Sequence, residues 1–209
     1  MTELFISALV TFFVVIDPPG CAPIFASLTT GTPAAHRRTM AIRSVLVASG
    51  ILLFFALLGE KLLGAMGISL DAFRVAGGIM LFMIAVDMVF EKRTERRNTR
   101  AEDVKAQAEH EDVSVFPMAI PMIAGPGSIA SVMLLTAQAK GTEATMAVLG
   151  ALAIVLVTTL ALLLAAAPVM KALGYKMEAM ITRILGVVLA ALAAQYVIDG
   201  IKASFALGG

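Results

Sequence analysis

The chain has 209 residues, of which 59% are hydrophobic and 15% are charged, and its mean hydropathy is +0.93. Soluble domains carry about 25% charged residues, so this composition excludes an ordinary soluble domain. A net charge of +1 excludes the basic surface typical of nucleic-acid-binding proteins, and a single cysteine excludes an intrachain disulfide. The sequence therefore predicts a small multi-pass protein of the lipid bilayer.

Six apolar segments are long enough to cross a bilayer, because a membrane helix needs about 20 residues. They are residues 4–29, 41–58, 73–90, 115–138, 145–168 and 181–201. The first segment lacks the basic start and the small-residue cleavage site of a signal peptide, so we expect it to be a membrane span. The predicted fold is an all-α membrane protein with six transmembrane helices.

One polar segment, residues 91–113, divides these spans into three plus three, and 13 of its 23 residues are charged. We interpret it as a solvated linker rather than a tail that docks a partner. The predicted organisation is a three-helix repeat at residues 1–90, a charged cytoplasmic linker at 91–113 and a second three-helix repeat at 114–209.

Lysine and arginine are distributed unevenly between the two sides of this arrangement. Twelve of them follow spans one, three and five, and four lie on the opposite side. Because positive charge accumulates on the cytoplasmic side, we expect a protein of the cytoplasmic (inner) membrane with both termini outside the cytoplasm.

An internal repeat relates the two halves. The pattern Pro19-Gly20, seven residues, Leu28-Thr29 recurs 107 residues later as Pro126-Gly127, seven residues, Leu135-Thr136. Because each half has three spans, the second copy must be inverted relative to the first, as in many secondary transporters. The sequence thus predicts two inverted three-helix repeats.

Six of the eight prolines lie in the first span of each half. An interior proline removes a hydrogen bond and costs about 3 kcal/mol or more, so we expect residues 17–23 and 124–127 to unwind and break helices 1 and 4 near the membrane midplane. Proline at 18, 19 and 126 frees the carbonyls of Val14, Val15 and Met122. The helices that follow should begin with free amides at residues 20–22 and 127–129. Such breaks must be buried in protein or line a watery cavity.

Asp17 is the one acidic residue in these breaks, and an acidic side chain near the bilayer centre is costly to keep. It is a candidate to bind a substrate ammonium group or to carry a proton, and the alternative is that it only caps the second half of the broken helix. The candidate substrate-binding residues are Asp17, Pro18, Gly20, Cys21, Ala22, Pro23, Gly125, Pro126, Gly127 and Ser128. Val14, Val15, Met122, Asp87 and Gln195 are candidates for coupling or secondary roles.

The sequence gives little support for enzyme chemistry. Its two histidines, His36 and His110, fall in predicted loops, and no apolar span pairs a serine or cysteine with a histidine. We therefore expect no enzyme, no metal and no cofactor, with H⁺ or Na⁺ as candidate coupling ions. Paired small residues such as Gly77-Gly78 are interpreted as sites of close helix packing.

Two motifs resemble the paired signatures of the MarC family of six-span inner-membrane proteins. They are Asp17-Pro-Pro-Gly-Cys-Ala-Pro-Ile-Phe25 and Pro117-Met-Ala-Ile-Pro121 followed by Ala124-Gly-Pro-Gly127. The third and sixth spans, with 73–79, 181–186, Gln195 and 199–200, are also similar to that family. The resemblance departs at Cys21, where the family usually has asparagine; a thiol is a weaker hydrogen-bonding group than an amide.

The resemblance extends to the SnatA members, which transport small neutral amino acids. It implies a secondary transporter of the glycine and alanine class that binds a zwitterionic substrate at the broken helices 1 and 4 by alternating access. The alternatives are a small-solute channel or exporter, or a noncatalytic membrane scaffold. Assembly as a homo-oligomer stays open.

Overall fold

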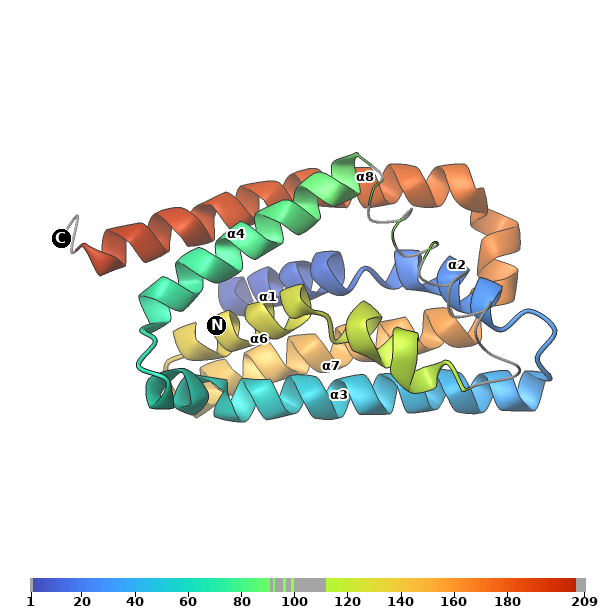
Figure 1. Ribbon diagram of the computed structural model, residues 1–209, viewed down its shortest axis with the longest axis horizontal. Helices are drawn as coiled ribbons and strands as arrows, with labels where there is room; N and C mark the ends of the chain where they lie inside the picture. The colour runs from blue at the N-terminus through green and yellow to red at the C-terminus, as the bar shows by residue number, and fades with distance from the viewer. Residues whose placement is uncertain (1, 91, 93–95, 97–98, 100–111, 206–209) are drawn as a thin grey trace.

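The computed structural model describes residues 2–90, 92, 96, 99 and 112–205, apart from the side chains of 167, 169–176 and 178. Most of the predicted linker, with His110, therefore lies outside the described residues. Ordered structure in the described part is entirely helical (Figure 1). The elements are α1 (Thr2–Ile16), α2 (Pro18–Leu28), α3 (Ala34–Ala65), α4 (Leu70–Val89), η1 (Ser114–Ile123), α6 (Pro126–Gln138), α7 (Thr142–Leu164) and α8 (Ala166–Ser204).

Five helical segments are long and apolar enough to cross a membrane, or six when the bent pair η1 and α6 counts as one span. The prediction of an all-α membrane protein is therefore confirmed. The first span is formed by α1 and α2 together, and they run along the long axis of Figure 1 in the direction opposite to η1 and α6. The start of α1 and the end of α8 lie toward the same end of the molecule.

Helix boundaries extend beyond the apolar segments that the sequence marks. His36, predicted in a loop, lies in the first turn of α3, and the loop predicted between the last two spans, residues 169–180, is part of α8. Those two assignments were wrong because the backbone hydrogen bonds of a helix can continue beyond its apolar residues into polar ones. Pro168 is tolerated in the first turn of α8, where amides have no acceptor within the helix.

The helices form a layered bundle with α4 and α8 side by side along one face and α3 along the other (Figure 1). Contacts between the halves come in matched pairs. α1 contacts α7 while η1 contacts α3, α2 contacts α7 while α6 contacts α3, and α2 contacts α8 while α6 contacts α4. The large buried side chains Phe12, Phe25, Leu52 and Leu152 lie in the core between these elements.

Glycines set the close approach of α4 and α8. A Cβ placed on Gly78 would lie 2.9 Å from the Ala193 carbonyl oxygen and 2.8 Å from Val197 Cγ2. At the two ends of the same contact, a Cβ on Gly186 would lie 3.1 Å from the carbonyl of Ala85, and one on Gly200 would lie 3.0 Å from that of Asp71. The predicted packing role is confirmed for Gly78.

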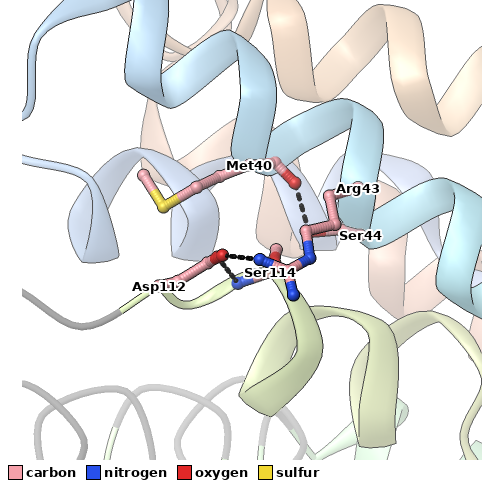
Figure 2. Close-up of polar contacts among 5 residues, drawn as sticks. All are labelled: Met40, Arg43, Ser44, Asp112 and Ser114. Atoms are coloured by element: carbon pink, nitrogen blue, oxygen red, sulfur yellow. Dashed lines mark hydrogen bonds and ion pairs between the residues drawn. The ribbon is translucent and has the colours of Figure 1, made fainter.

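A charged contact joins the start of the second half to α3 (Figure 2). The carboxylate of Asp112 forms an ion pair with Arg43 and accepts a hydrogen bond of 2.9 Å from the backbone amide of Ser114. On α3 the Ser44 hydroxyl donates to the Met40 carbonyl at 2.8 Å. Partial burial alone would raise the pKa of Asp112, but hydrogen bonding from Ser114 and the charge of Arg43 outweigh it and hold this pKa below its ordinary value.

This lowered pKa predicts a pH-dependent contribution to stability. The contribution is fully present above the ordinary carboxyl pKa of 3.8 and is lost as the pH falls through the lower pKa of the folded protein. Because Arg43 is 57% exposed, we expect at most about 1 kcal/mol. Thermal unfolding of wild type and Asp112→Asn in detergent from pH 2 to 7 measures it. The difference between the proteins should vanish at the acid end, and a difference that instead grows toward low pH would contradict the assignment.

The α4–α8 contact predicts that Gly78→Ala destabilises the fold by about 1–3 kcal/mol, because the new methyl group meets backbone atoms that cannot rotate away. The matched control is Gly50→Ala on α3, where nothing lies within 4 Å of the added Cβ. Alanine favours helices by about 1 kcal/mol over glycine, so this control should be neutral or slightly more stable. Equilibrium unfolding in detergent compares the two, and equal stabilities would disprove the role of Gly78.

Candidate functional site

The first helical interruption is a single residue, Asp17. α1 ends at Ile16, α2 begins at Pro18, and Asp17 between them has the left-handed backbone conformation (φ 58°, ψ 64°). Its carboxylate accepts a hydrogen bond of 3.2 Å from the Gly20 amide, and its carbonyl accepts one of 3.0 Å from the Cys21 amide. The expectation that residues 17–23 unwind was wrong, because Pro18 occupies a first-turn position that needs no amide and Asp17 caps the turn.

The residues around this interruption are packed rather than open. Asp17 is 1% exposed and Cys21 and Ala22 are fully buried, while Pro18 is buried and Pro23 is half-buried. The Cys21 thiol donates to the Ile16 carbonyl over 3.5 Å.

Gly20 makes room for the Asp17 carboxylate. A Cβ on Gly20 would lie 2.2 Å from Asp17 Oδ2. The expected free amides at Gly20 and Cys21 are therefore engaged within the turn. The structure thus supports the capping alternative for Asp17.

The second interruption is longer and has a different cause. Phe116 and Ile120 in η1 have extended backbone (φ −124° and −126°), the conformation that a following proline favours. After Ala124, Gly125 is extended again (φ −82°, ψ 172°), and the axes of η1 and α6 differ by 53°. Pro126 is the first residue of α6. At this end of the helix, the Ile129 amide donates a hydrogen bond of 3.0 Å to the Gly125 carbonyl.

A cavity of about 410 Å³ opens at this second interruption. Four elements contribute to its walls, together with Arg96 after α4 and Gly125 between η1 and α6. The lining residues are Val15 of α1; Met80, Met83, Ile84 and Asp87 of α4; Arg96; Pro121 and Met122 of η1; Gly125; and Pro126, Gly127 and Ser128 of α6. The predicted residues of the second break, with Val15, Met122 and Asp87, are thus brought together around one space.

Opposite charges meet in this cavity. Asp87 forms an ion pair with Arg96, and their side chains are 21% and 72% exposed. The N-terminus of α6 also lines the cavity, and Gly125 has no side chain to cap it. The first amides of a helix, here those of Gly127 and Ser128, have no acceptor within it and give this end a partial positive charge. The cavity therefore offers one carboxylate and one cationic helix end to a small ligand.

Eight predicted residues do not line this cavity. Five of them lie at the packed first interruption: Pro18, Gly20, Cys21, Ala22 and Pro23. Asp17 does not line this cavity, Val14 packs in the core beside Leu81, and the Gln195 amide donates to Asp199 at 2.8 Å along the exposed side of α8. Sequence reasoning also missed Met80, Met83, Ile84, Pro121 and Arg96. The methionines and Ile84 look like any other apolar residues of α4, and Arg96 looks like one more linker charge.

The packing of Gly20 predicts a coupled effect on stability. Gly20→Ala should cost about 1–3 kcal/mol, because its methyl group would occupy the place of the Asp17 carboxylate. In an Asp17→Gly background the same substitution should be close to neutral. A double-mutant cycle from unfolding in detergent measures this coupling. Additive effects would show that Gly20 does not accommodate Asp17.

The apolar spans, one with a packed interruption and one whose interruption borders a cavity, define an integral, multi-pass membrane protein. Comparison with protein families identifies the chain further: residues 2–205 match the model described as MarC family integral membrane protein, and the chain belongs to this family.

Curated relatives cover nearly the whole chain. It is 36% identical over 200 residues to UPF0056 membrane protein MJ1677 of Methanocaldococcus jannaschii, covering 96% of this chain and 97% of the relative. It is 34% identical over 205 residues to UPF0056 membrane protein YvbG of Bacillus subtilis, covering 98% and 97%. A UPF0056 membrane protein of Archaeoglobus fulgidus is also 34% identical, with 95% and 92% covered. Comparison with solved structures found no match.

Proposed function

We propose that the protein is a secondary transporter of small neutral amino acids, of the glycine and alanine class, across the cytoplasmic membrane, as in the SnatA members of its family. The observation that carries the proposal is the cavity at the second interruption. It has a volume of about 410 Å³, and both Asp87 and the N-terminus of α6 line it. Ligand sites of this kind measure about 300–1,000 Å³, so a small amino acid fits the available volume.

The substrate would be held at both of its charges. Its carboxylate would accept hydrogen bonds from the amides of Gly127 and Ser128, at the positive end of the α6 dipole. Its ammonium group would meet Asp87 in place of Arg96. Asp87 thus takes the role first considered for Asp17, because Asp87 lines the cavity and Asp17 caps a buried turn. The coupling ion would be H⁺ or Na⁺.

The proposed mechanism is alternating access between two inverted three-helix repeats, with the interruptions near the membrane midplane. Three observations support the repeat. The interruptions at Asp17 and Ala124 are 107 residues apart, the helices that contain them run in opposite directions, and the contacts between the halves are exchanged in pairs. Symmetry of this kind lets one half take the conformation of the other, which opens the site to the opposite side.

The proposed orientation puts both termini outside the cytoplasm. Arg37 and Arg38 lie at the end of the bundle where α3 begins and α7 ends, and Lys140 and Lys202 lie at the other end. The sequence assigns the linker arginines and lysines to the same side as Arg37 and Arg38, and this excess of basic residues favours placing that side in the cytoplasm.

Transport in proteoliposomes tests the proposal. Wild-type protein should take up labelled glycine and alanine in a saturable way and exchange them with unlabelled amino acid inside. Asp87→Asn should lower uptake at low substrate by about tenfold or more, because a charged contact to the ammonium group is lost. The matched control is Asp71→Asn, which also removes an aspartate of α4 from an ion pair with an arginine, Arg74, but does not line the cavity.

The outcome separates the rival functions. Uptake equal to that of empty liposomes would favour a scaffold, and uptake that does not saturate and shows no exchange would favour a channel. Equal losses of uptake in Asp87→Asn and Asp71→Asn would show that the substrate does not bind at Asp87 in this cavity.

A further inference from the structure

A second cavity lies at the end of the bundle where α3 begins and α7 ends. It has a volume of about 360 Å³ and is lined by Ala34, Arg37, Arg38, Leu163 and Leu164. None of these residues lines the cavity at the second interruption. This second cavity is therefore a different site from the proposed transport site.

In the part of the chain that the structure describes, no carboxylate balances the positive charge on the basic side of this cavity. The first turns of α3 contain His36, Arg37 and Arg38 but no acidic residue, and Pro33 before them makes no side-chain cap. Cations are unfavourable at a helix N-terminus, because that end already carries partial positive charge. Within the described residues, neither guanidinium forms an ion pair with a carboxylate. An anion bound between them would remove this repulsion.

Arg43 shows what a neutralised arginine looks like in the same helix. It is less than two turns further along α3 and pairs with Asp112 (Figure 2). Arg37 is half-buried all the same, although the burial of a charge without a partner is unfavourable. Arg37 and Arg38 thus differ from Arg43 in having no carboxylate partner among the residues that the structure describes.

The other side of the cavity is apolar and belongs to the surface of a membrane span. Leu163 is 1% exposed and closes the cavity from inside, whereas Leu164 is 45% exposed at the last turn of α7. A ligand here meets guanidinium groups at its polar end and leucine beside them. Soluble anions such as free phosphate have no apolar part to place on Leu164.

We propose that this cavity binds the head group of an anionic phospholipid. Its phosphate would pair with Arg37 and Arg38, since guanidinium groups bind phosphate through two parallel hydrogen bonds, and its acyl chain would lie along Leu164. Basic pockets between membrane helices recognise anionic lipids in this manner, and the cytoplasmic leaflet carries the negative surface charge. The site lies on the more basic end of the bundle.

Lipid titration tests the site. Purified protein is placed in phosphatidylcholine nanodiscs with increasing phosphatidylglycerol, and the unfolding temperature is measured, with retained lipid counted by native mass spectrometry. Phosphatidylglycerol should raise the unfolding temperature of the wild type. In the double variant Arg37→Gln and Arg38→Gln, about tenfold or more phosphatidylglycerol should be needed for the same rise, the loss expected for one charge-assisted hydrogen bond.

The matched control is Lys140→Gln with Lys202→Gln, which removes two charges at the opposite end of the bundle and should behave as wild type. A second variant, Leu164→Ser, keeps both arginines and should also weaken the response to lipid. If the glutamine variant does not fold, Arg37→Lys with Arg38→Lys keeps the charges and should lose only part of the response.

Three outcomes would overturn the proposal. An equal loss in the lysine control would mean that only the net charge matters. An equal rise with inorganic phosphate would make the site one for free phosphate. An unchanged response in both the glutamine variant and Leu164→Ser would mean that anionic lipid acts elsewhere.

Discussion

A backbone amide or carbonyl at membrane depth must find a hydrogen-bond partner in the protein or in a water-filled cavity, and each proline removes one backbone N–H donor. The arrangement of the helices depends on how this requirement is met at Asp17 and at Gly125. At the first position the chain satisfies itself, because a side chain caps the new helix and a glycine makes space for it. At the second position no side chain caps the helix, and a cavity lies in front of it. Two interruptions at corresponding positions of the chain thus differ in whether they leave hydrogen-bonding capacity for a ligand.

Sequence reasoning gave the helical membrane fold and located both interruptions, because apolar length and proline position act locally along the chain. It was less successful with the geometry of each interruption. Whether Asp17 points back to Gly20 or into a cavity depends on one backbone conformation that composition does not encode. The pairing of Asp87 with Arg96 depends on the path of the segment between them. Helix ends were missed for a similar reason, since the bonds that continue α3 and α8 past the apolar residues leave no mark in hydropathy.

The charged side chains near the ends of the helices also differ in whether a described residue of opposite charge pairs with them. Asp112 and Arg43 neutralise each other where the second half begins, so this junction is electrostatically complete within the protein. The start of α3 carries arginines whose charges no described residue balances. A multi-pass protein can use the lipid around it as a structural component in such a place. The proposed head-group site would then hold the first turn of α3 against the last turn of α7 through a molecule that the bilayer provides.

The glycine contacts between α4 and α8 limit the ways in which the molecule can move. Gly78, Gly186 and Gly200 bring the two backbones so close that a shift of one residue along the contact would press side chains into carbonyl groups. Sliding of one helix along the other would therefore be costly, and we expect the pair to behave as one stiff element. If the cavity opens by the proposed alternating access, we expect this element to rotate as a whole against α1, α3, α6 and α7. Since Asp87 belongs to the stiff element and Gly127 to the remaining helices, such a rotation would change the distance between the two groups that face a ligand.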